Sequence, residues 1–389
     1  MKLGKVLFAF LLIGFFISAT PAGAGKPIIV DDPETDEDSP AAMHAVHSSA
    51  VPPLPPAIIG DPVVDSPLNL LSWPQDVPNT VPDLTEPTAN RLNDLHARFS
   101  DCDFALSSAG NYHMALRELW YDVFLPNYTS DLGLKNWFYI TSPPITLNQI
   151  KNKSVVFGNV SLTCRPQVAV GPPAFITQLT AAGYTTGAPV PVFHSRGNVL
   201  LVKKGNPKYI QSVWDLRRPD VSVVTPNPST EKSTFDNYSQ SIYSIAANDD
   251  QNAPGGWDAV RLFNAIFNAS VPNEDLGVPH VRNKWFIGTK IHHREVPWSI
   301  AYGQADAGVL FYHLALNAVQ NFPDLFEIVP LGGTADDPQP LPGNRISTHQ
   351  AIRINGAWTP LQQTAADRFI DALNSSEFTR ILTKYGLTR

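Results

Sequence analysis

The 389-residue chain is poor in cysteine, has no excess of basic residues and has no long apolar run beyond its N-terminus. Cys102 and Cys164 are its only cysteines, too few to complete a structural zinc site by themselves. With 28 basic and 35 acidic residues, the chain lacks the positive surplus typical of nucleic-acid-binding proteins. After the leader, no apolar run reaches the roughly 18 residues that a membrane-spanning helix needs. We therefore predict no nucleic-acid partner and no membrane span.

Signatures of common enzymes are also missing. The sequence has no G-x-S-x-G nucleophile elbow, no P-loop, no dinucleotide-binding fingerprint and no zinc signature. His292, His293 and Glu295 suggest a metal site at first sight, but adjacent side chains on a strand point apart, so this segment supplies too few ligands. We predict no catalytic residue, no metal and no cofactor. A hydrolase that uses Ser107 with a distant His and Asp stays open as the third hypothesis.

Residues 1–24 have the organisation of a secretory signal peptide. Lys2 and Lys5 precede an apolar core over residues 6–17, and Ala22-Gly23-Ala24 offers a small-residue cleavage site. No cysteine lies near that site, which argues against a lipid anchor. We expect a secreted protein, located in the periplasm if the host is a Gram-negative bacterium.

Residues 25–89 are rich in proline and acidic side chains, including the run VPPLPP at 51–56. Proline in this density prevents a sustained helix or central strand, so we predict an extended tether. Between residues 26 and 90 there are eleven acidic residues and one basic residue, Lys26. The remaining body, residues 91–389, carries 24 acidic and 25 basic residues and would not repel a small anion.

Strand, loop and helix patterns alternate in the first half of the body. The expected strands at 104–106, 137–140 and 167–170 precede the expected helices at 112–124, 147–151 and 174–182, respectively. Three such units in succession predict a parallel, doubly wound sheet. The loops after the first two strands are rich in Ser and Thr, and a helix N-terminus with hydroxyl donors can hold an anion. Ordinary helix capping uses the same residue types, so both interpretations stay open.

We predict a disulfide between Cys102 and Cys164, because an even pair of cysteines in an exported protein is best explained by one bond. If 103–107 and 167–170 are neighbouring parallel strands, each cysteine precedes the start of its strand. Adjacent strands lie roughly 4.8 Å apart, within reach of disulfide geometry. Two free buried thiols are the alternative.

Three later stretches carry a resemblance to a known family. The segment LLVKKGNPKYIQSVWDLRRPDVSVVTPNPST at 200–230 has a strand, a helix and a loop in the order found in type II periplasmic solute-binding proteins. Residues 288–312, with helical spacing at 295–301 and the apolar run 309–312, resemble the helix and strand by which the second lobe contacts its solute. The ending SSEFTRILTKYGLTR resembles the terminal helix of the family. The resemblance covers about 103–389 and is strongest to the molybdate- and tungstate-binding proteins of ABC importers.

The resemblance implies an α/β, two-lobed, periplasmic-binding-protein-like type II fold, each lobe a mainly parallel sheet flanked by helices, with the ligand cleft between the lobes. We expect the first lobe at 90–196, the second at 197–325, and strands at 326–330 and 346–354 within a return segment at 326–389. The protein would be a monomer that captures a tetrahedral oxyanion by lobe closure for an ABC permease, molybdate or tungstate first and sulfate next. The alternative is a stand-alone secreted binding or sensing module for another small anionic or organic ligand.

In this family most donors to the oxyanion are hydroxyls and backbone N–H groups on loops of both lobes. The aromatic hydroxyl that the family places at a strand end falls on Phe311 in the simplest register, with Tyr312 one residue late. A one-residue slip matters because it reverses the face of a strand. By position, the resemblance implies ligand contacts from Ser107, Ser108, Ala109, Gly110, Asn111, Thr141, Ser142, Ser229, Thr230, Glu295, Val296 and Tyr312.

Overall fold

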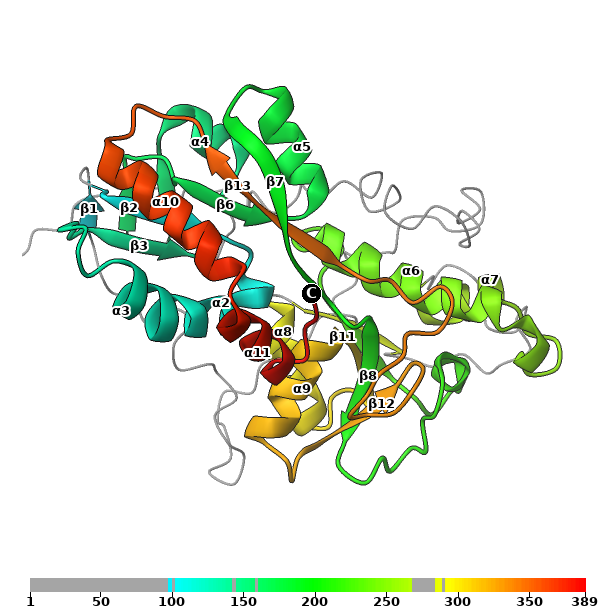
Figure 1. The fold of residues 1–389 in the computed structure, drawn as a ribbon. Coiled ribbons are helices and arrows are strands. Elements are labelled where there is room, and N and C mark those ends of the chain that lie inside the picture. Colours follow the sequence, from blue (N-terminus) through cyan, green and yellow to red (C-terminus); the bar gives the residue numbers. More distant parts are fainter. Residues whose placement is uncertain (1–96, 100–101, 142–144, 158–159, 268–283, 289–290) are drawn as a thin grey trace, which may run out of the picture. The chain divides into compact units, whose positions relative to one another are not determined.

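The computed structural model describes residues 97–99, 102–141, 145–157, 160–267, 284–288 and 291–389 (Figure 1). The predicted signal peptide and tether lie outside these residues, as does Ser142. In the described part of the chain, no helix combines the length and the apolar character needed to cross a membrane.

The first five-stranded sheet has the order β3-β2-β6-β13-β7. Strand β2 (Phe104–Ser107) runs parallel to β3 (Trp137–Ile140) on one side and to β6 (Val168–Gly171) on the other. Strand β13 (Thr348–Ile354) pairs antiparallel with both β6 and β7 (Thr185–His194), so four of the five strands run one way. This arrangement confirms the predicted mainly parallel sheet.

Helices cover both faces of this sheet because its central strands are apolar on both sides. On β2, Phe104 and Leu106 contribute to one hydrophobic cluster and Ala105 to another. The first cluster includes α2 (His113–Glu118), the π-helical turn η4 (Leu119–Phe124), α10 (Pro360–Leu373) and α11 (Ser376–Lys384). The second includes α4 (Leu147–Asn152) and α5 (Pro173–Ala181). Helix α3 (Leu125–Tyr128) continues η4, and a small sheet is formed by β1 (Ala97–Phe99), β5 (Val160–Leu162) and β4 (Val155–Phe157).

The second five-stranded sheet repeats this plan with the order β10-β9-β11-β8-β12. Strands β10 (Trp285–Ile287), β9 (Val223–Thr225) and β11 (Ala307–Phe311) are parallel, and β8 (Asn198–Lys203) runs antiparallel to its neighbours β11 and β12 (Phe326–Pro330). The predicted α/β class with two mainly parallel sheets is therefore confirmed. The associated helices are η5 (Val213–Arg217), α6 (Lys232–Asn248), η6 (Asp250–Asn252), α7 (Ala259–Phe267), α8 (His292–Ala301) and α9 (Tyr312–Asn321).

One predicted boundary is wrong. The strand at 326–330 was expected to return to the first lobe, but β12 pairs with β8 in the second sheet over Phe326 to Pro330. Pairing with β8 satisfies the backbone groups of β12 directly after α9, before the chain leaves the second sheet. The return to the first sheet therefore follows Pro330 and is completed by β13.

The disulfide between Cys102 and Cys164 is present, with the two Cα atoms 6.2 Å apart. The strands beside it, β2 and β6, are parallel neighbours that pair Leu106 with Val168. The structure thus confirms both the bond and the strand arrangement from which the sequence predicted it.

Two segments connect the sheets: residues 195–197 between β7 and β8, and residues 331–347 between β12 and β13. They are bonded to each other, because Ser195 N–H donates to Ser347 O and Ser347 N–H donates to Ser195 Oγ, both at 2.8 Å. Asn344 closes a second pair, accepting from Asn198 N–H at 2.8 Å and donating to Asn198 O at 2.9 Å. We call residues 195–198 together with 344–347 the crossover.

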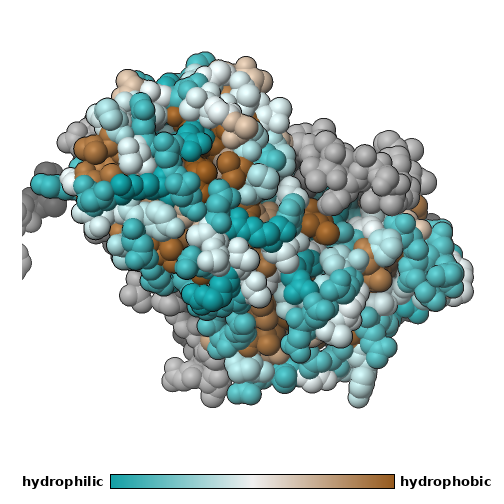
Figure 2. Space-filling view, viewed as in Figure 1, coloured by the Kyte–Doolittle hydropathy of each residue, from teal (hydrophilic) through white to brown (hydrophobic). Residues whose placement is uncertain are grey.

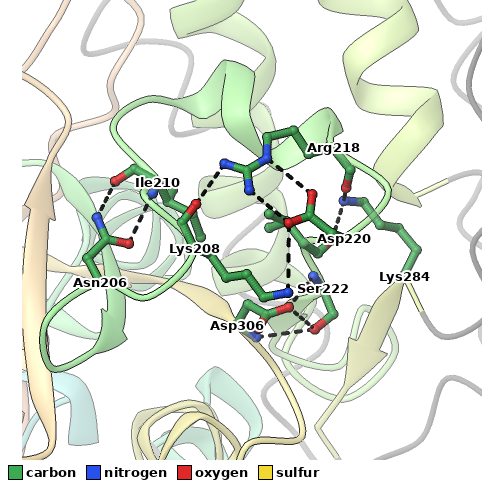
Figure 3. A network of polar contacts seen from close by, with 9 residues as sticks. Asn206, Lys208, Ile210, Arg218, Asp220, Ser222, Lys284 and Asp306 are labelled. Carbon is green, nitrogen blue, oxygen red and sulfur yellow. Dashed lines mark hydrogen bonds and ion pairs between the residues drawn. The ribbon is translucent and has the colours of Figure 1, made fainter.

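The opposite end of the second sheet is closed by a polar network around Asp306 and Lys284 (Figure 3). Asp306 accepts hydrogen bonds at 2.9 Å from both the N–H and the hydroxyl of Ser222. The Lys284 ammonium donates to Arg218 O at 2.7 Å and also to Val221 O. Burial lowers the pKa of Lys284 to about 7.

The surface in Figure 2 is mixed in character, with hydrophilic residues over most of the visible face and hydrophobic residues in small groups between them. Large exposed hydrophobic side chains of the described part come from four separate segments. They are Tyr121, Tyr209, Leu341 and Leu361.

Candidate functional site

The carboxyl end of β2 leads into a buried polar loop. Ser107 and Ser108 are 2% and 1% exposed, respectively. Ser107 Oγ accepts from Ile145 N–H at 3.4 Å, and Ser108 N–H donates to Ile140 O at 2.8 Å. Ser108 Oγ has no hydrogen-bond partner among the residues that the structure describes. Because an unsatisfied buried hydroxyl costs about 1–3 kcal/mol, this oxygen indicates a place for a ligand or an ordered water.

Rings from both sheets meet beside this loop. We call Tyr112, Phe193, Phe311, His313 and His349 the ring cluster. Tyr112, in the short helix η3 (Gly110–Tyr112), lies 4.7 Å from the ring of His313 and 4.2 Å from that of His349, centroid to centroid. Phe311 stacks on His313 at 5.6 Å, and Phe193 stacks on His349 at 5.0 Å.

A hydrogen bond adds to this contact between the two halves of the fold. His313, at the start of α9 directly after β11, donates from Nε2 to Asn111 O at 2.9 Å. Because a carbonyl oxygen only accepts, this bond places the ring proton of His313 on Nε2. In the neutral imidazole, Nδ1 is then a bare lone pair. This atom is buried and has no partner within the described ranges.

Helix α8 presents its N-terminus near the same rings. Its N-cap residue is Ile291, which has no side-chain acceptor, and Glu231 at the start of α6 supplies the cap from a distance. One Glu231 oxygen accepts from His292 N–H at 3.1 Å, and the other accepts from His292 Nδ1 at 2.6 Å. Both side chains are buried, at 7% and 1% exposure. The carboxylate thus fixes both the helix terminus and the His292 ring.

His293 connects α8 to the first loop. Its ring centroid lies 6.3 Å from that of His113, whose Nδ1 donates to Gly110 O at 2.8 Å. Burial lowers the pKa of His293 well below its usual value, and the nearby groups His292, His113, Arg294 and His313 lower it further. Burial likewise lowers the pKa of His313 to about 3 and that of His349 to about 3. These three imidazoles are therefore neutral near pH 7.

The structure places only part of the predicted site next to these rings. Ser107 to Asn111 form the loop itself, and Thr141 lies half-buried at the end of β3. Ser229 and Thr230 are exposed, and their N–H groups donate to Asn227 Oδ1 at 2.8 and 3.4 Å. The third loop is thus an exposed turn organised by Asn227.

The predicted start of the ligand-contacting helix is wrong by one turn. Helix α8 begins at His292, and Glu295 and Val296 are 1% and 0% exposed inside it. Val296 packs where a side chain on Gly308 of β11 would lie, and the carboxylate of Glu295 lies against Gly288. Both residues therefore face the second sheet. His292 and His293, expected on a strand, occupy the first turn of the helix instead.

The end of β11 resolves the choice between two aromatic residues. Tyr312 donates its hydroxyl to Asp336 O at 3.3 Å, and its ring lies 5.6 Å from the Arg196 guanidinium. Phe311, in contrast, belongs to the ring cluster. The side chain that faces the first loop from this strand end therefore has no hydroxyl.

Sequence reasoning missed most of the rings. His313 and His349 are isolated in the sequence, and the bond from His313 to Asn111 spans 202 positions. Glu231 was missed for the same reason, since its partner His292 is 61 positions away. In the described part of the chain, no group of three or more His, Cys, Asp or Glu residues is arranged to hold a metal ion.

Two five-stranded, mainly parallel sheets, each with one antiparallel strand next to an edge strand, are joined by two crossing segments, and this arrangement is typical of two-lobed solute-binding folds. Residues 167–388 match the family described as bacterial extracellular solute-binding protein. Because this match covers more than half of the sequence, the chain belongs to that family. It is a bacterial-type extracellular solute-binding protein, in a family of binding proteins rather than enzymes, and the family implies an extracytoplasmic location.

Several solved structures are similar to this chain. Peb3 from Campylobacter jejuni shares 17% identity, with 74% of this chain and 99% of that chain covered and a TM-score of 0.42. The sulfate-binding protein SubI from Mycobacterium tuberculosis shares 16%, with 75% and 86% covered and a TM-score of 0.44. The substrate-binding domain of a putative molybdenum ABC transporter from Clostridium difficile shares 13%, with 75% and 99% covered and a TM-score of 0.44. Comparison with curated proteins gives no match.

Proposed function

We propose that this protein captures a small anion between its two lobes and delivers it to an ABC permease, with molybdate or tungstate as the first candidate and sulfate as the next. The unsatisfied, buried Ser108 hydroxyl at the carboxyl end of β2 carries the proposal. In α/β proteins, ligands bind at the carboxyl ends of parallel strands. A hydroxyl there donates a hydrogen bond to an anion without adding a charge of its own.

The surroundings of Ser108 support an anion rather than a cation. Arg294 is a permanent positive charge on α8 close to His293, whose ring lies 6.3 Å from that of His113 just after the first loop. The nearby carboxylate of Glu231 is already committed to His292. A small anion held here would find fixed donors and few competing negative groups.

The lobe boundaries and the cleft are part of the same proposal. We place the change of lobe at the crossover, with β7 and β13 on one side and β8 and β12 on the other. Closure would bring the first loop and the N-terminus of α8 onto the solute. Export by a cleaved leader, with a periplasmic location in a Gram-negative host, completes the proposal.

A second candidate ligand is a small organic anion, such as a carboxylate or a phosphorylated carboxylate. The ring cluster favours it, because Tyr112, Phe193 and Phe311 add apolar surface that a bare tetrahedral oxyanion does not need. In that case the protein would be an organic-anion importer component or a stand-alone sensing module.

Calorimetric titration and thermal unfolding with molybdate, tungstate, sulfate, phosphate and small carboxylates test these candidates. A solute at 100 times its Kd stabilises the folded protein by about 2.7 kcal/mol, so the melting temperature should rise with the true ligand. We expect Ser108→Ala to weaken binding by roughly 10- to 150-fold, the cost of one hydrogen bond to a charged group.

Ser376→Ala, which removes an exposed hydroxyl on α11, is the matched control and should bind like the wild type. If no inorganic or organic anion shifts the melting temperature, the proposed ligand class is wrong. Genes for a permease and an ATPase beside the gene of this protein would support transport, and their absence would favour the sensing module.

A further inference from the structure

We propose that solute binding at this site is coupled to proton uptake, and that His313 and His293 are the residues that take up the proton. This inference rests on the proposed function, because it assumes that the solute is an anion. It concerns the pH dependence and the solute preference of the site.

The geometry of His313 is the first step. Its Nε2 proton is committed to Asn111 O, so the neutral ring can present only the Nδ1 lone pair to a solute. An oxyanion without hydroxyl groups also presents only lone pairs. Two acceptors that face each other in a buried site repel, and neither satisfies the other. Protonation of Nδ1 turns this acceptor into a charge-assisted donor to the anion.

His293 offers a second buried ring nitrogen, on α8. Its Nδ1 is also buried and unpaired in the described part of the structure. His293 lies on the first turn of α8, and its ring is next to that of His113 on α2, just after the first loop. The two candidate proton acceptors therefore come from α9 and α8, and both lie close to the loop that carries Ser108.

The charges around these rings explain why the empty site stays neutral. The ring cluster is buried, and the one carboxylate on the adjoining helix start, Glu231, is already paired with His292. A proton added without an anion would lie unpaired beside the positive charge of Arg294. The titratable and charged groups that face His293 and His313 are Tyr112 on η3, His113 on α2, Glu231 before α6, His292 and Arg294 on α8, and His349 on β13, which itself faces His194 on β7.

A bound anion changes this balance. It supplies the missing counter-charge, so the pKa of a contacting imidazole rises when the site is filled. The proton comes from solvent and forms an N–H bond at the ring lone pair, and no other bond changes. Between the pKa of the empty site and that of the filled site, each bound proton makes affinity rise by up to about tenfold for each unit that the pH falls. A solute that carries its own hydroxyl, such as hydrogen phosphate, can instead donate to the lone pair and needs less uptake.

Isothermal titration of the full chain with sulfate and with molybdate tests the coupling. Both are dianions between about pH 6 and about pH 8, so the solute itself does not titrate. Titrations in buffers of different ionisation enthalpy give the number of protons taken up. We expect uptake of about 0.5–1 proton per anion, with affinity rising toward the acidic end.

His313→Gln is the first variant, because its side-chain amide can still donate to Asn111 O while the titrating nitrogen is lost. His293→Gln is the second variant, on a different helix. His194→Gln is the matched control, since it removes an imidazole from β7 outside the pair. We expect the first two variants to reduce proton uptake and flatten the pH profile, while the control retains both.

The outcomes separate the two proposals. If sulfate or molybdate binds with the same affinity across this range and without proton uptake, the coupling is wrong while the anion site stands. If uptake persists in both variants, the proton is held elsewhere and the assignment to His313 and His293 is wrong. If no anion binds at any pH, both the coupling and the proposed function fail. Thermal unfolding of the unliganded variants checks that each is folded.

Discussion

At the scale of single residues, Glu231 is the contact on which the α8 terminus depends. Its two oxygens satisfy the N–H and the Nδ1 of His292, and Ile291 offers no alternative cap. In Glu231→Gln the neutral amide keeps one acceptor oxygen and loses the charge. We expect the free energy of unfolding to fall by about 1.5–3 kcal/mol, the range for a hydrogen bond to a charged group, as measured by urea denaturation.

Asp236→Asn provides the comparison for this prediction. Asp236 is the acid of an ion pair on the same helix, with a half-exposed partner in Lys232 at 2.7 Å. Pairs with this helical spacing contribute about 0.3–0.5 kcal/mol, so the control should change stability by a similar amount. If the two substitutions lower the free energy of unfolding equally, the contact of Glu231 with the start of α8 contributes no more than an exposed ion pair.

Residue-level sequence analysis picks out local patterns and misses contacts that only the fold assembles. Ser108 was predicted as a ligand contact because a hydroxyl between a strand and a helix is a recognisable pattern, and its Oγ is buried with no partner among the described residues. Tyr312 was preferred as a ligand contact because of its hydroxyl. Phe311 is the residue that belongs to the ring cluster, because successive side chains along β11 point to opposite faces. His313 was missed, since nothing local indicates a bond to Asn111.

At the scale of elements, most strands were predicted where apolar runs are short and bounded by turns, as at Phe326–Pro330. Strand β7 was missed because Gly187, Pro189 and Pro191 interrupt its pattern. Proline is tolerated there because β7 is an edge strand of the first sheet, where its missing N–H breaks no inner ladder. The start of α8 was missed because its cap comes from a residue distant in sequence.

The network at the start of β10 and β11 gives a prediction for pH dependence. Burial lowers the pKa of Lys284 from its ordinary value to about 7, so the unfolded chain binds this proton more tightly than the folded one. The cost of the buried ammonium is fully present below about pH 7 and is relieved as the pH rises toward the unfolded value of about 10.5. We expect the wild type to gain stability over Lys284→Met by up to about 1.4 kcal/mol per pH unit in this window.

Chemical denaturation between about pH 7 and about pH 10 measures this difference. Lys208→Met is the matched control, because Lys208 reaches Asp220 at 3.8 Å from the exposed side of the same network. The difference between the two pH profiles gives the part of the pH dependence of stability that comes from the buried Lys284 ammonium. Parallel profiles for the two variants would contradict the prediction.

At the scale of the whole molecule, the plan of the fold was predicted, while the point where the chain changes sheets was not. The order of strands, loops and helices predicts the first mainly parallel sheet and the family resemblance implies the second, and both are present. The position of β12 depends on whether the chain pairs once more with β8 before leaving the second sheet, and its mainly apolar sequence would suit either sheet. The crossover therefore had to be located by hydrogen bonds such as those of Ser195 and Asn344.

The crossover also makes a prediction that separates stability from binding. Gly197 has φ of +76°, and a Cβ there would lie 2.9 Å from Pro340 and 3.1 Å from Asn344. Gly205, with φ of +77°, has nothing within 4 Å of a built Cβ. Gly205→Ala should therefore cost only the backbone term of about 1 kcal/mol, whereas Gly197→Ala adds a shift of the two crossing segments.

We expect Gly197→Ala to lower the free energy of unfolding by about 2–3 kcal/mol and also to weaken solute affinity, because displaced crossing segments move one sheet relative to the other. Gly205→Ala should leave affinity unchanged. Urea denaturation measures the first quantity and calorimetric titration with the bound anion measures the second. If both variants bind the solute like the wild type, the crossover does not govern how the first loop and α8 approach each other, and closure must be set elsewhere in the chain.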